Sequence, residues 1–410
     1  MVIEHELVCR LNYGIETVMA DVVIRQQNDC SLIATVTPRQ SISLISSTAN
    51  CLLESIPGSS SLLLKETPVK ISNYNIPLEA NLGVAELELQ NLPQDRDIVS
   101  VKMYLTNIFD PYFYKNNIPI DINIPGQQKV VLSAYTEGKI SHIAEVSQIP
   151  YSELENIKNL IDSICWLCSF ASGYLSTIAR TEVLWDGQLI YQELTSVDTT
   201  LNQQGRKVIC DVDDLTKFIE HTYRYYKEFA TPYNLNNLIS LGILAKHTPY
   251  TQVKTLLMCN FLEVLRYNYA LNIGCPNGYF TQRDDDFNWV NGAKAGSRAF
   301  FQEILEHFYT ANSLTGWHSS FKHIRDQIVH TGNITGSTSL EKIQKYQNLH
   351  HFCDRVILAL LQWDSVSGYY IPRNSPTNPN PEVIVEEDPN PEVIVEEEMI
   401  VNVNRIPFIR

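Results

Sequence analysis

The sequence predicts an α+β protein in three parts: a β-rich domain over residues 1–148, a helical bundle over 149–370 and a disordered tail over 371–410. Short runs rich in Val, Ile, Leu and Thr, separated by turn residues, fill the first part. Such runs are typical of the strands of a sandwich or a partly closed barrel. Helical spacing of apolar residues dominates the second part. An acidic decapeptide that occurs twice, with two prolines in each copy, marks the third.

The candidate strands of the β-rich domain are separated by turn residues at 27–29, 57–60 and 93–95. The clearest of these strands cover residues 17–25, 31–36, 85–89 and 98–105. No cluster of catalytic residue types appears among them. We therefore expect this domain to serve recognition or regulation.

Two capping boxes mark helix starts in the second part, Ser152 with Glu155 and Thr338 with Glu341. In this motif each residue's side chain bonds the backbone of the other. A hairpin with an Asp-Gly turn is expected over 181–194, as a small β insertion in the bundle. The expected helices run from the first box to about residue 172 and over 212–229, 234–246, 251–272, 293–311, 317–331 and 339–363.

The composition is that of an ordinary globular protein, with 44% hydrophobic and 19% charged residues among 410. No apolar run is long enough to cross a bilayer, and residues 1–20 show no secretory signal. The nine cysteines are scattered and odd in number, which indicates reduced thiols and a cytoplasmic location. Cys165 and Cys168 form a CxxC inside an apolar helical segment, so we expect core packing rather than redox or metal chemistry.

The formal net charge is −15, and its distribution limits the kinds of partner. Residues 380–398 contain eight acids and no base, and removing those eight charges leaves −7 for the rest of the chain. A broad positive surface of the kind used to bind duplexes is therefore absent, so a nucleic acid must be held by a local basic site. The Val-Ile-Val segments of the tail either stay solvated or pair with the edge of a partner's sheet.

The most informative segment covers residues 321–332 and places Arg325, Asp326 and His330 in one expected helix. Arginine is a permanent, forked cation suited to phosphate, and histidine exchanges protons near neutral pH. At 100° per residue, Arg325 and His330 lie about 140° apart on a straight helix. A helical buried stripe is expected on Phe321, Ile324 and Ile328.

This arginine–histidine spacing resembles the signature of the HEPN superfamily, which is Arg, a polar residue, then His, in a late helix of an α bundle. The match here is Arg325, Asp326 and His330. A β-rich region before a C-terminal helical domain is most similar to the ApeA-type HEPN proteins of bacterial phage defence. The resemblance covers roughly residues 151–363.

The resemblance implies a metal-independent endoribonuclease without cofactors, acting as an antiviral defence or toxin effector. HEPN domains pair, so it also implies a homodimer in which two motif copies share one cleft. His330 would handle the proton of the RNA 2′-hydroxyl or of the leaving 5′-oxygen, Arg325 would stabilise phosphate charge, and Asp326 would orient one of them. Lys322 and His323 are the expected RNA contacts.

Other functions remain open for the same residues. A HEPN-like protein without catalysis would act as a scaffold, binding protein partners through its β domain and its tail. The helix of Arg325 could also be a simple solvated surface. Metal binding is a further alternative, because six histidines lie within 307–351, but no HExxH motif or close ligand spacing supports it.

Two acidic features outside the motif have similar alternatives. Asp284, Asp285 and Asp286 are consecutive, and they either bind a hard cation or form a solvated loop. Glu303 and Glu306 precede the motif on an expected helix, and they either add an acid to its cleft or lie on the surface.

Overall fold

The structure of the chain, a computed structural model, places residues 1–370 in one compact unit and residues 371–410 in a second. The second unit lies outside the described residues, and so does the predicted acidic tail. The structure describes residues 3–363 except 14–15, 41–50, 57–61, 66, 74–76, 90–96, 109–118, 198–207, 210–211, 284–285, 290–299, 313, 315–319, 335 and 337.

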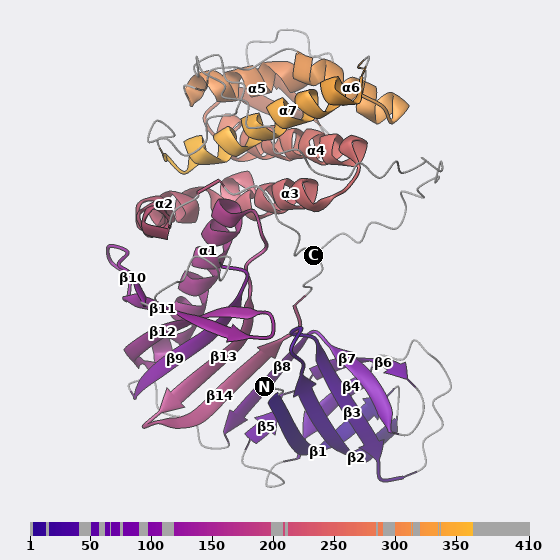
Figure 1. Cartoon of the computed structure of the whole chain (residues 1–410), viewed down its shortest axis with the longest axis vertical. Coiled ribbons are helices and arrows are strands. Elements are labelled where there is room, and N and C mark those ends of the chain that lie inside the picture. The colour runs from indigo at the N-terminus through magenta and orange to yellow at the C-terminus, as the bar shows by residue number, and fades with distance from the viewer. Residues whose placement is uncertain are drawn as a thin grey trace, which may run out of the picture. The chain divides into compact units, whose positions relative to one another are not determined.

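The predicted α+β class is confirmed, and the β-rich region begins with a closed six-stranded barrel (Figure 1). Alternate residues of its strands point inward, as Leu32, Ala34 and Val36 do, and are buried in the barrel core. This is the period expected of strands with one buried face. The barrel strands, in order around the barrel, are β1 (Ile3–Tyr13), β2 (Glu16–Gln26), β3 (Leu32–Pro38), β7 (Leu78–Leu82), β6 (Thr67–Asn73) and β4 (Cys51–Ser55).

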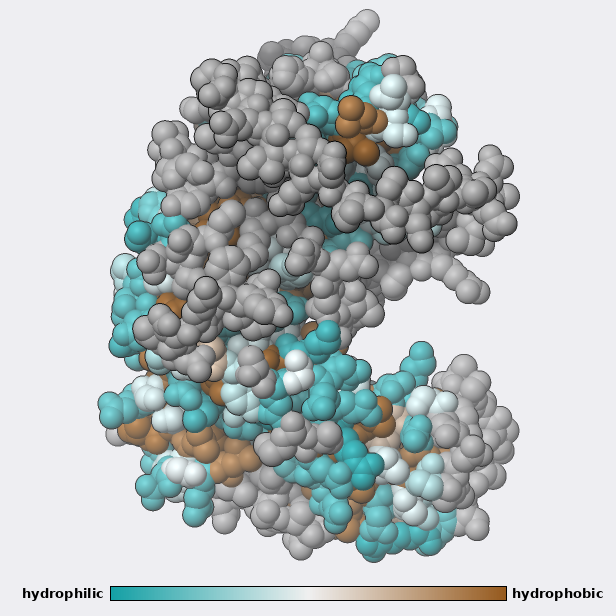
Figure 2. Space-filling model, in the orientation of Figure 1, coloured by the Kyte–Doolittle hydropathy of each residue, from teal (hydrophilic) through white to brown (hydrophobic). Residues whose placement is uncertain are grey.

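An eight-stranded sheet follows the barrel. Among the residues that Figure 2 colours, most are hydrophilic, and the broadest apolar area lies over this sheet. Ile98 and Trp185, at the ends of two adjacent strands, are exposed large apolar residues of the sheet. Its strand order is β10 (Ile120–Ile122), β11 (Val130–Glu137), β12 (Ile140–Pro150), β9 (Ile98–Thr106), β13 (Ile178–Trp185), β14 (Gln188–Thr195), β8 (Val84–Leu89) and β5 (Leu62–Leu64).

The predicted hairpin is β13–β14, and its turn residues Asp186 and Gly187 have φ of 49° and 77°. Positive φ at both positions is what a two-residue hairpin turn requires. Its placement as an insertion in the helical bundle was wrong. Strand β13 pairs with β9 and β14 pairs with β8, so the hairpin completes the eight-stranded sheet. The sequence pattern specifies a hairpin but not the strands on either side of it.

Seven helices among the described residues form the C-terminal half (Figure 1). Apolar side chains of the sheet, of α1 and of the later helices belong to one continuous core. No helix in the described part of the chain is both long and apolar enough to cross a membrane. The helices are α1 (Leu154–Ser172), α2 (Val212–Tyr233), α3 (Leu235–His247), α4 (Thr251–Tyr269), α5 (Phe300–Ala311), α6 (Ser320–Thr331) and α7 (Ser339–Leu360).

The two predicted capping boxes have different outcomes. Thr338 accepts a hydrogen bond from the backbone N–H of Glu341 at 3.2 Å and caps α7. The box at Ser152 is not formed, because residues Tyr151–Glu153 make a 3-10 turn and the cap of α1 has no side-chain bond. The backbone N–H of Tyr151 instead donates to the backbone carbonyl of Asp97 at 2.9 Å, which connects this turn to the start of β9.

The CxxC cysteines are buried, as predicted, on the apolar side of α1. Burial raises the pKa of Cys168 to about 12, so this thiol stays protonated at neutral pH. A protonated buried thiol is a poor nucleophile and a poor metal ligand. Cys165 and Cys168 are therefore packing residues of the core.

Candidate functional site

Helix α6 carries the predicted motif, and its apolar side packs against its neighbours. Phe321, Ile324 and Ile328 are buried, which confirms the predicted stripe. The ring of Phe321 lies 5.2 Å from that of Phe352 on α7. Gly332, with a φ of 68°, follows the helix, and its N–H donates to the carbonyl of Ile328 at 3.0 Å. The helix therefore ends one residue after His330, as its His-Thr-Gly sequence predicts.

Arg325 lies beside this stripe and reaches across to α4. Its Nη2 is 2.6 Å from Oε1 of Glu263, and its Nη1 donates to Oδ1 of Asp326 at 2.8 Å. The second oxygen of Glu263 accepts from Nε of Arg266 at 3.1 Å. Two arginines and two carboxylates therefore form one chain of ion pairs, in the order Arg266, Glu263, Arg325 and Asp326.

The surroundings of Arg325 keep it charged and fixed. Its side chain is 26% exposed. Partial burial acts to lower its pKa, but the hydrogen bonds and charges of Asp326 and Glu263 outweigh burial and raise the pKa above its ordinary value. Beneath the network, burial raises the pKa of Cys259 to about 12, which leaves a neutral thiol. The guanidinium of Arg325 is thus a permanent cation of this site.

His330 is exposed in the last turn of α6. No described residue forms a hydrogen bond or an ion pair with its ring. Five residues along a helix amount to about 500°, which places His330 about 140° around α6 from Arg325. The structure therefore brings Arg325 together with Asp326, but it does not join His330 to either within one chain.

The two expected RNA contacts lie on the outer side of α6. His323 is exposed, and its Nε2 is 2.5 Å from Nε2 of Gln327. Lys322 is half-buried. Val329, one turn after Arg325, is 50% exposed, which is high for a branched apolar side chain.

The structure describes several of the predicted acids and histidines outside α6. His307 bonds the hydroxyl of Tyr269 at 2.6 Å. Residues 277–291, expected as a polar loop around the three aspartates, include two paired strands, β15 (Phe280–Arg283) and β16 (Asp286–Trp289). Asp284, Asp285 and His318 lie outside the described residues. Glu303 lies in the first turn of α5, and Glu306 is exposed on the same helix.

A metal centre has no support in the described part of the chain, where no three His, Cys, Asp or Glu side chains are grouped to hold an ion. His350 and Asp354 on α7 form a pair, with 3.9 Å between Nε2 and Oδ1. Lys246 lies 3.8 Å from the same oxygen and supplies the compensating positive charge. This buried trio resembles a structural ion pair rather than a ligand set.

Glu263 is the residue of the site that the sequence pattern missed. It lies within the apolar run of α4, three residues before Arg266. Glu263 and Arg266 are the only charged residues of the stretch 256–269. That pair was a usable signal, because charged residues on a core helix are usually paired. Comparison of the chain with protein-family models, with curated proteins and with solved structures finds no match in any of the three.

Proposed function

We propose that this chain is a metal-independent endoribonuclease of the HEPN type, in which Arg325 and His330 act on one phosphodiester. The observation that supports this most is the contrast between the two groups on α6. Arg325 is a half-buried guanidinium fixed by two carboxylates, whereas His330 is exposed in the same helix. A fixed cation and an accessible imidazole are what cleavage of RNA without a metal requires.

The proposed reaction is attack of the RNA 2′-hydroxyl on the neighbouring phosphorus. His330 removes the 2′-hydroxyl proton or returns a proton to the leaving 5′-oxygen, which gives a 2′,3′-cyclic phosphate and a 5′-hydroxyl. Arg325 stabilises the negative charge that develops on the phosphoryl oxygens. Asp326 is the more exposed of its two carboxylate partners, so its bond is the one that an incoming phosphate would replace.

A second copy of the chain completes the site in this proposal. The separation of about 140° between the two groups puts them on different sides of α6 within one copy. In a two-fold dimer the same surface of both copies is in contact, so Arg325 of one copy can face His330 of its partner. The half-exposed Val329 near Arg325 supplies an apolar contact for such an interface.

A non-catalytic HEPN-like scaffold is the second candidate. The observation that favours it is that Glu263 and Asp326 already balance the charge of Arg325. A guanidinium between two carboxylates is also what a structural ion-pair network contains. In that case partners would bind through the β-rich region or the acidic tail, and no RNA would be cleaved.

RNA cleavage by single variants separates the nuclease from the scaffold. Arg325→Ala and His330→Ala should each lower cleavage of single-stranded RNA by about 100-fold or more, with chelator present throughout. Arg39→Ala is the matched control, because Arg39 is also paired with a carboxylate, Asp21, but directly follows the barrel strand β3. Equal cleavage by wild type, Arg325→Ala and His330→Ala would remove the nuclease proposal. A folded wild-type protein that cleaves no RNA would favour the scaffold.

Mixing the two inactive variants then tests the shared site. A wild-type dimer would contain two Arg325–His330 pairs, each formed between the two copies. Half of the re-equilibrated dimers contain one copy of each variant, and each such dimer retains one of its two pairs. About one quarter of the wild-type activity should therefore return. No recovery after subunit exchange would place both groups in one chain and contradict the composite site.

A further inference from the structure

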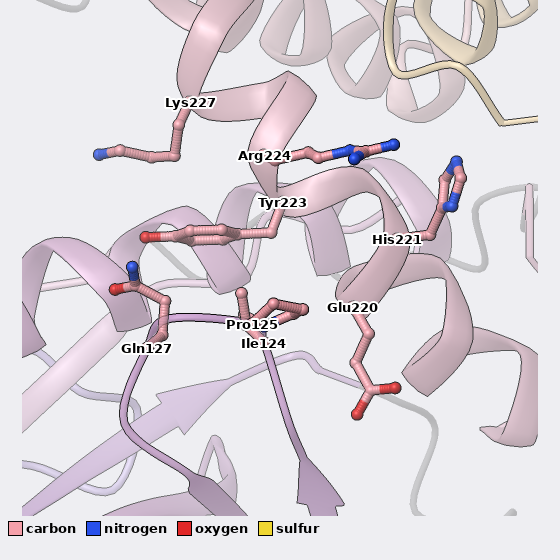
Figure 3. A pocket seen from close by; sticks show the side chains of 8 residues that line it. All are labelled: Ile124, Pro125, Gln127, Glu220, His221, Tyr223, Arg224 and Lys227. Carbon is pink, nitrogen blue, oxygen red and sulfur yellow. The ribbon is translucent and has the colours of Figure 1, made fainter.

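The open cavity beside α2, of about 660 Å³, does not bring its charged groups together. Figure 3 shows Arg224 and Lys227 pointing to opposite sides of the helix. The turn between β10 and β11 supplies the facing wall, with Ile124, Pro125 and Gln127. The two cations of this cavity therefore do not meet on one anion.

A much smaller cavity, of about 10 Å³, lies inside the helical half. Its two charged lining side chains, Lys246 of α3 and Asp354 of α7, are each 5% exposed. Its apolar lining residues are at most 3% exposed, so the cavity is an interior one. These apolar residues come from α1, α3, α4 and α7 and are Phe170, Ile239, Ile243, Phe261, Cys353 and Ile357.

Lys246 and Asp354 meet at this cavity without a direct hydrogen bond between them. Nζ of Lys246 is 3.8 Å from Oδ1 of Asp354, and Nε2 of His350 is 3.9 Å from the same oxygen. A direct hydrogen bond between an ammonium and a carboxylate spans about 2.7–2.9 Å. At more than about 3.5 Å, a water molecule can bridge two polar groups almost as favourably as a direct bond.

The second carboxyl oxygen of Asp354 also needs a donor. Oδ2 is buried and accepts no hydrogen bond from any residue in the described part of the chain. Glu193 shows the satisfied arrangement, because its Oε2 accepts from Nζ of Lys158 at 2.6 Å and from the hydroxyl of Tyr191 at 2.7 Å. Buried carboxylates are unfavourable without such bonds, so nearly all of them are bonded to protein groups or to ordered water.

One water molecule fits this cavity in both size and chemistry. A cavity needs roughly 10–15 Å³ to hold one water, which then makes two to four hydrogen bonds to polar groups. The ammonium of Lys246 can donate one of these bonds, and the carboxylate of Asp354 can accept another. A metal cation would meet the positive charge of Lys246, and an anion would meet the negative charge of Asp354, so a neutral ligand is favoured.

We propose that this interior cavity is a binding site for one structural water, which accepts from Nζ of Lys246 and donates to Oδ2 of Asp354. The water completes the long ion pair and thereby connects α3 to α7 in the core of the bundle. Neither residue belongs to the motif on α6, so the site is independent of the chemistry proposed for Arg325 and His330.

A high-resolution crystal structure of the full-length chain tests the site directly. A water oxygen should lie about 2.7–3.2 Å from both Nζ of Lys246 and a carboxyl oxygen of Asp354. Direct contact between Lys246 and Asp354 at that distance, with no water in the cavity, would overturn the proposal.

Magnetic relaxation dispersion of water oxygen gives a second test in solution, because it counts buried waters that exchange slowly with the bulk. The double variant Lys246→Met/Asp354→Leu replaces the pair with apolar side chains, and apolar cavities stay dry. This variant should therefore hold one slowly exchanging water fewer than the wild type. Equal counts in the two proteins would contradict the bound water.

Lys158→Met/Glu193→Leu is the matched control. It removes an ion pair that is already in direct contact at 2.6 Å and does not line the cavity. Its count of slowly exchanging waters should equal that of the wild type, and an equal loss in both double variants would also contradict the site. The crystal structure decides the question by itself if Lys246→Met/Asp354→Leu does not fold.

Discussion

Glu263 on α4 and Arg325 on α6 form an ion pair with 2.6 Å between Oε1 and Nη2, and Glu263 simultaneously holds Arg266. One carboxylate thus sets the position of two guanidinium groups from two helices. Since Arg325 is the proposed phosphate-binding group, Glu263 is its positioning residue.

Glu263→Gln should destabilise the protein by about 1–2 kcal/mol, because it leaves two partly buried arginines close together without their shared carboxylate. Urea denaturation measures this difference. Glu4→Gln is the control, since Glu4 pairs with Arg25 at 2.6 Å in a more exposed place. The control should lose much less stability. Equal losses in the two variants would mean that the network is no stronger than a surface pair.

Val329→Asp should dissociate the proposed dimer, because it places a charge in an apolar contact beside Arg325. Sedimentation of wild type and variant over a range of concentrations gives the oligomeric state. RNA cleavage should fall together with the dimer, since each site then lacks the partner's group. Tyr250→Asp, at a 59% exposed position on another helix start, should affect neither. A wild-type chain that stays monomeric at every concentration contradicts this prediction.

His142 should make stability depend on pH between about 4 and 6.5. Burial lowers the pKa of His142 to about 4 in the folded protein, from an ordinary value near 6.5. The unfolded chain binds the proton first, so this contribution is complete above pH 6.5 and is lost as the pH falls toward 4. The full difference is on the order of 3 kcal/mol.

His142→Asn removes this titration, and comparing its unfolding free energy with that of wild type at several pH values isolates the effect from the carboxylates. The wild type should lose stability more steeply than His142→Asn over this range. Parallel curves would show that His142 has the same pKa in both states.

Gln26→Leu should lower the stability of the protein by removing contacts between the barrel and the eight-stranded sheet. The amide of Gln26 is buried and donates to the carbonyls of Ala179 at 2.7 Å and Thr195 at 3.1 Å. Leucine leaves both acceptors without this donor, which costs about 1–3 kcal/mol. Thermal unfolding should show a lower midpoint for Gln26→Leu than for Gln27→Leu, an exposed neighbour. Equal midpoints would show that water replaces the amide without cost.

Local features of the fold were predictable from the sequence, and contacts between distant segments were not. Thr338 caps α7 by accepting from the backbone N–H of Glu341, only three residues away in the chain. Ser152 does not, because Tyr151 continues the pairing of the preceding strand through its bond to Asp97. The hairpin turn was readable from Asp186 and Gly187, but the strands that flank it depend on the whole sheet.

The same distinction applies to the candidate sites. Arg325 and Asp326 are adjacent in the chain, so their pairing could be expected, whereas Glu263 reaches them only through the packing of α4 against α6. The open cavity beside α2 shows the same limit. The cations of α2 are visible in the sequence, but the wall that faces them comes from the turn after β10.

The position of the β13–β14 hairpin determines which shorter fragments of the chain retain a complete eight-stranded sheet. Strands β9 and β8 lie on its two sides, and both come before α1 in the chain. A fragment ending at Pro150 would lack β13 and β14. The backbone amides and carbonyls of β9 and β8 that pair with them would then be open to aggregation. A fragment that runs through Thr195, with α1 included, retains every strand of that sheet, and this is the shorter piece worth expressing on its own.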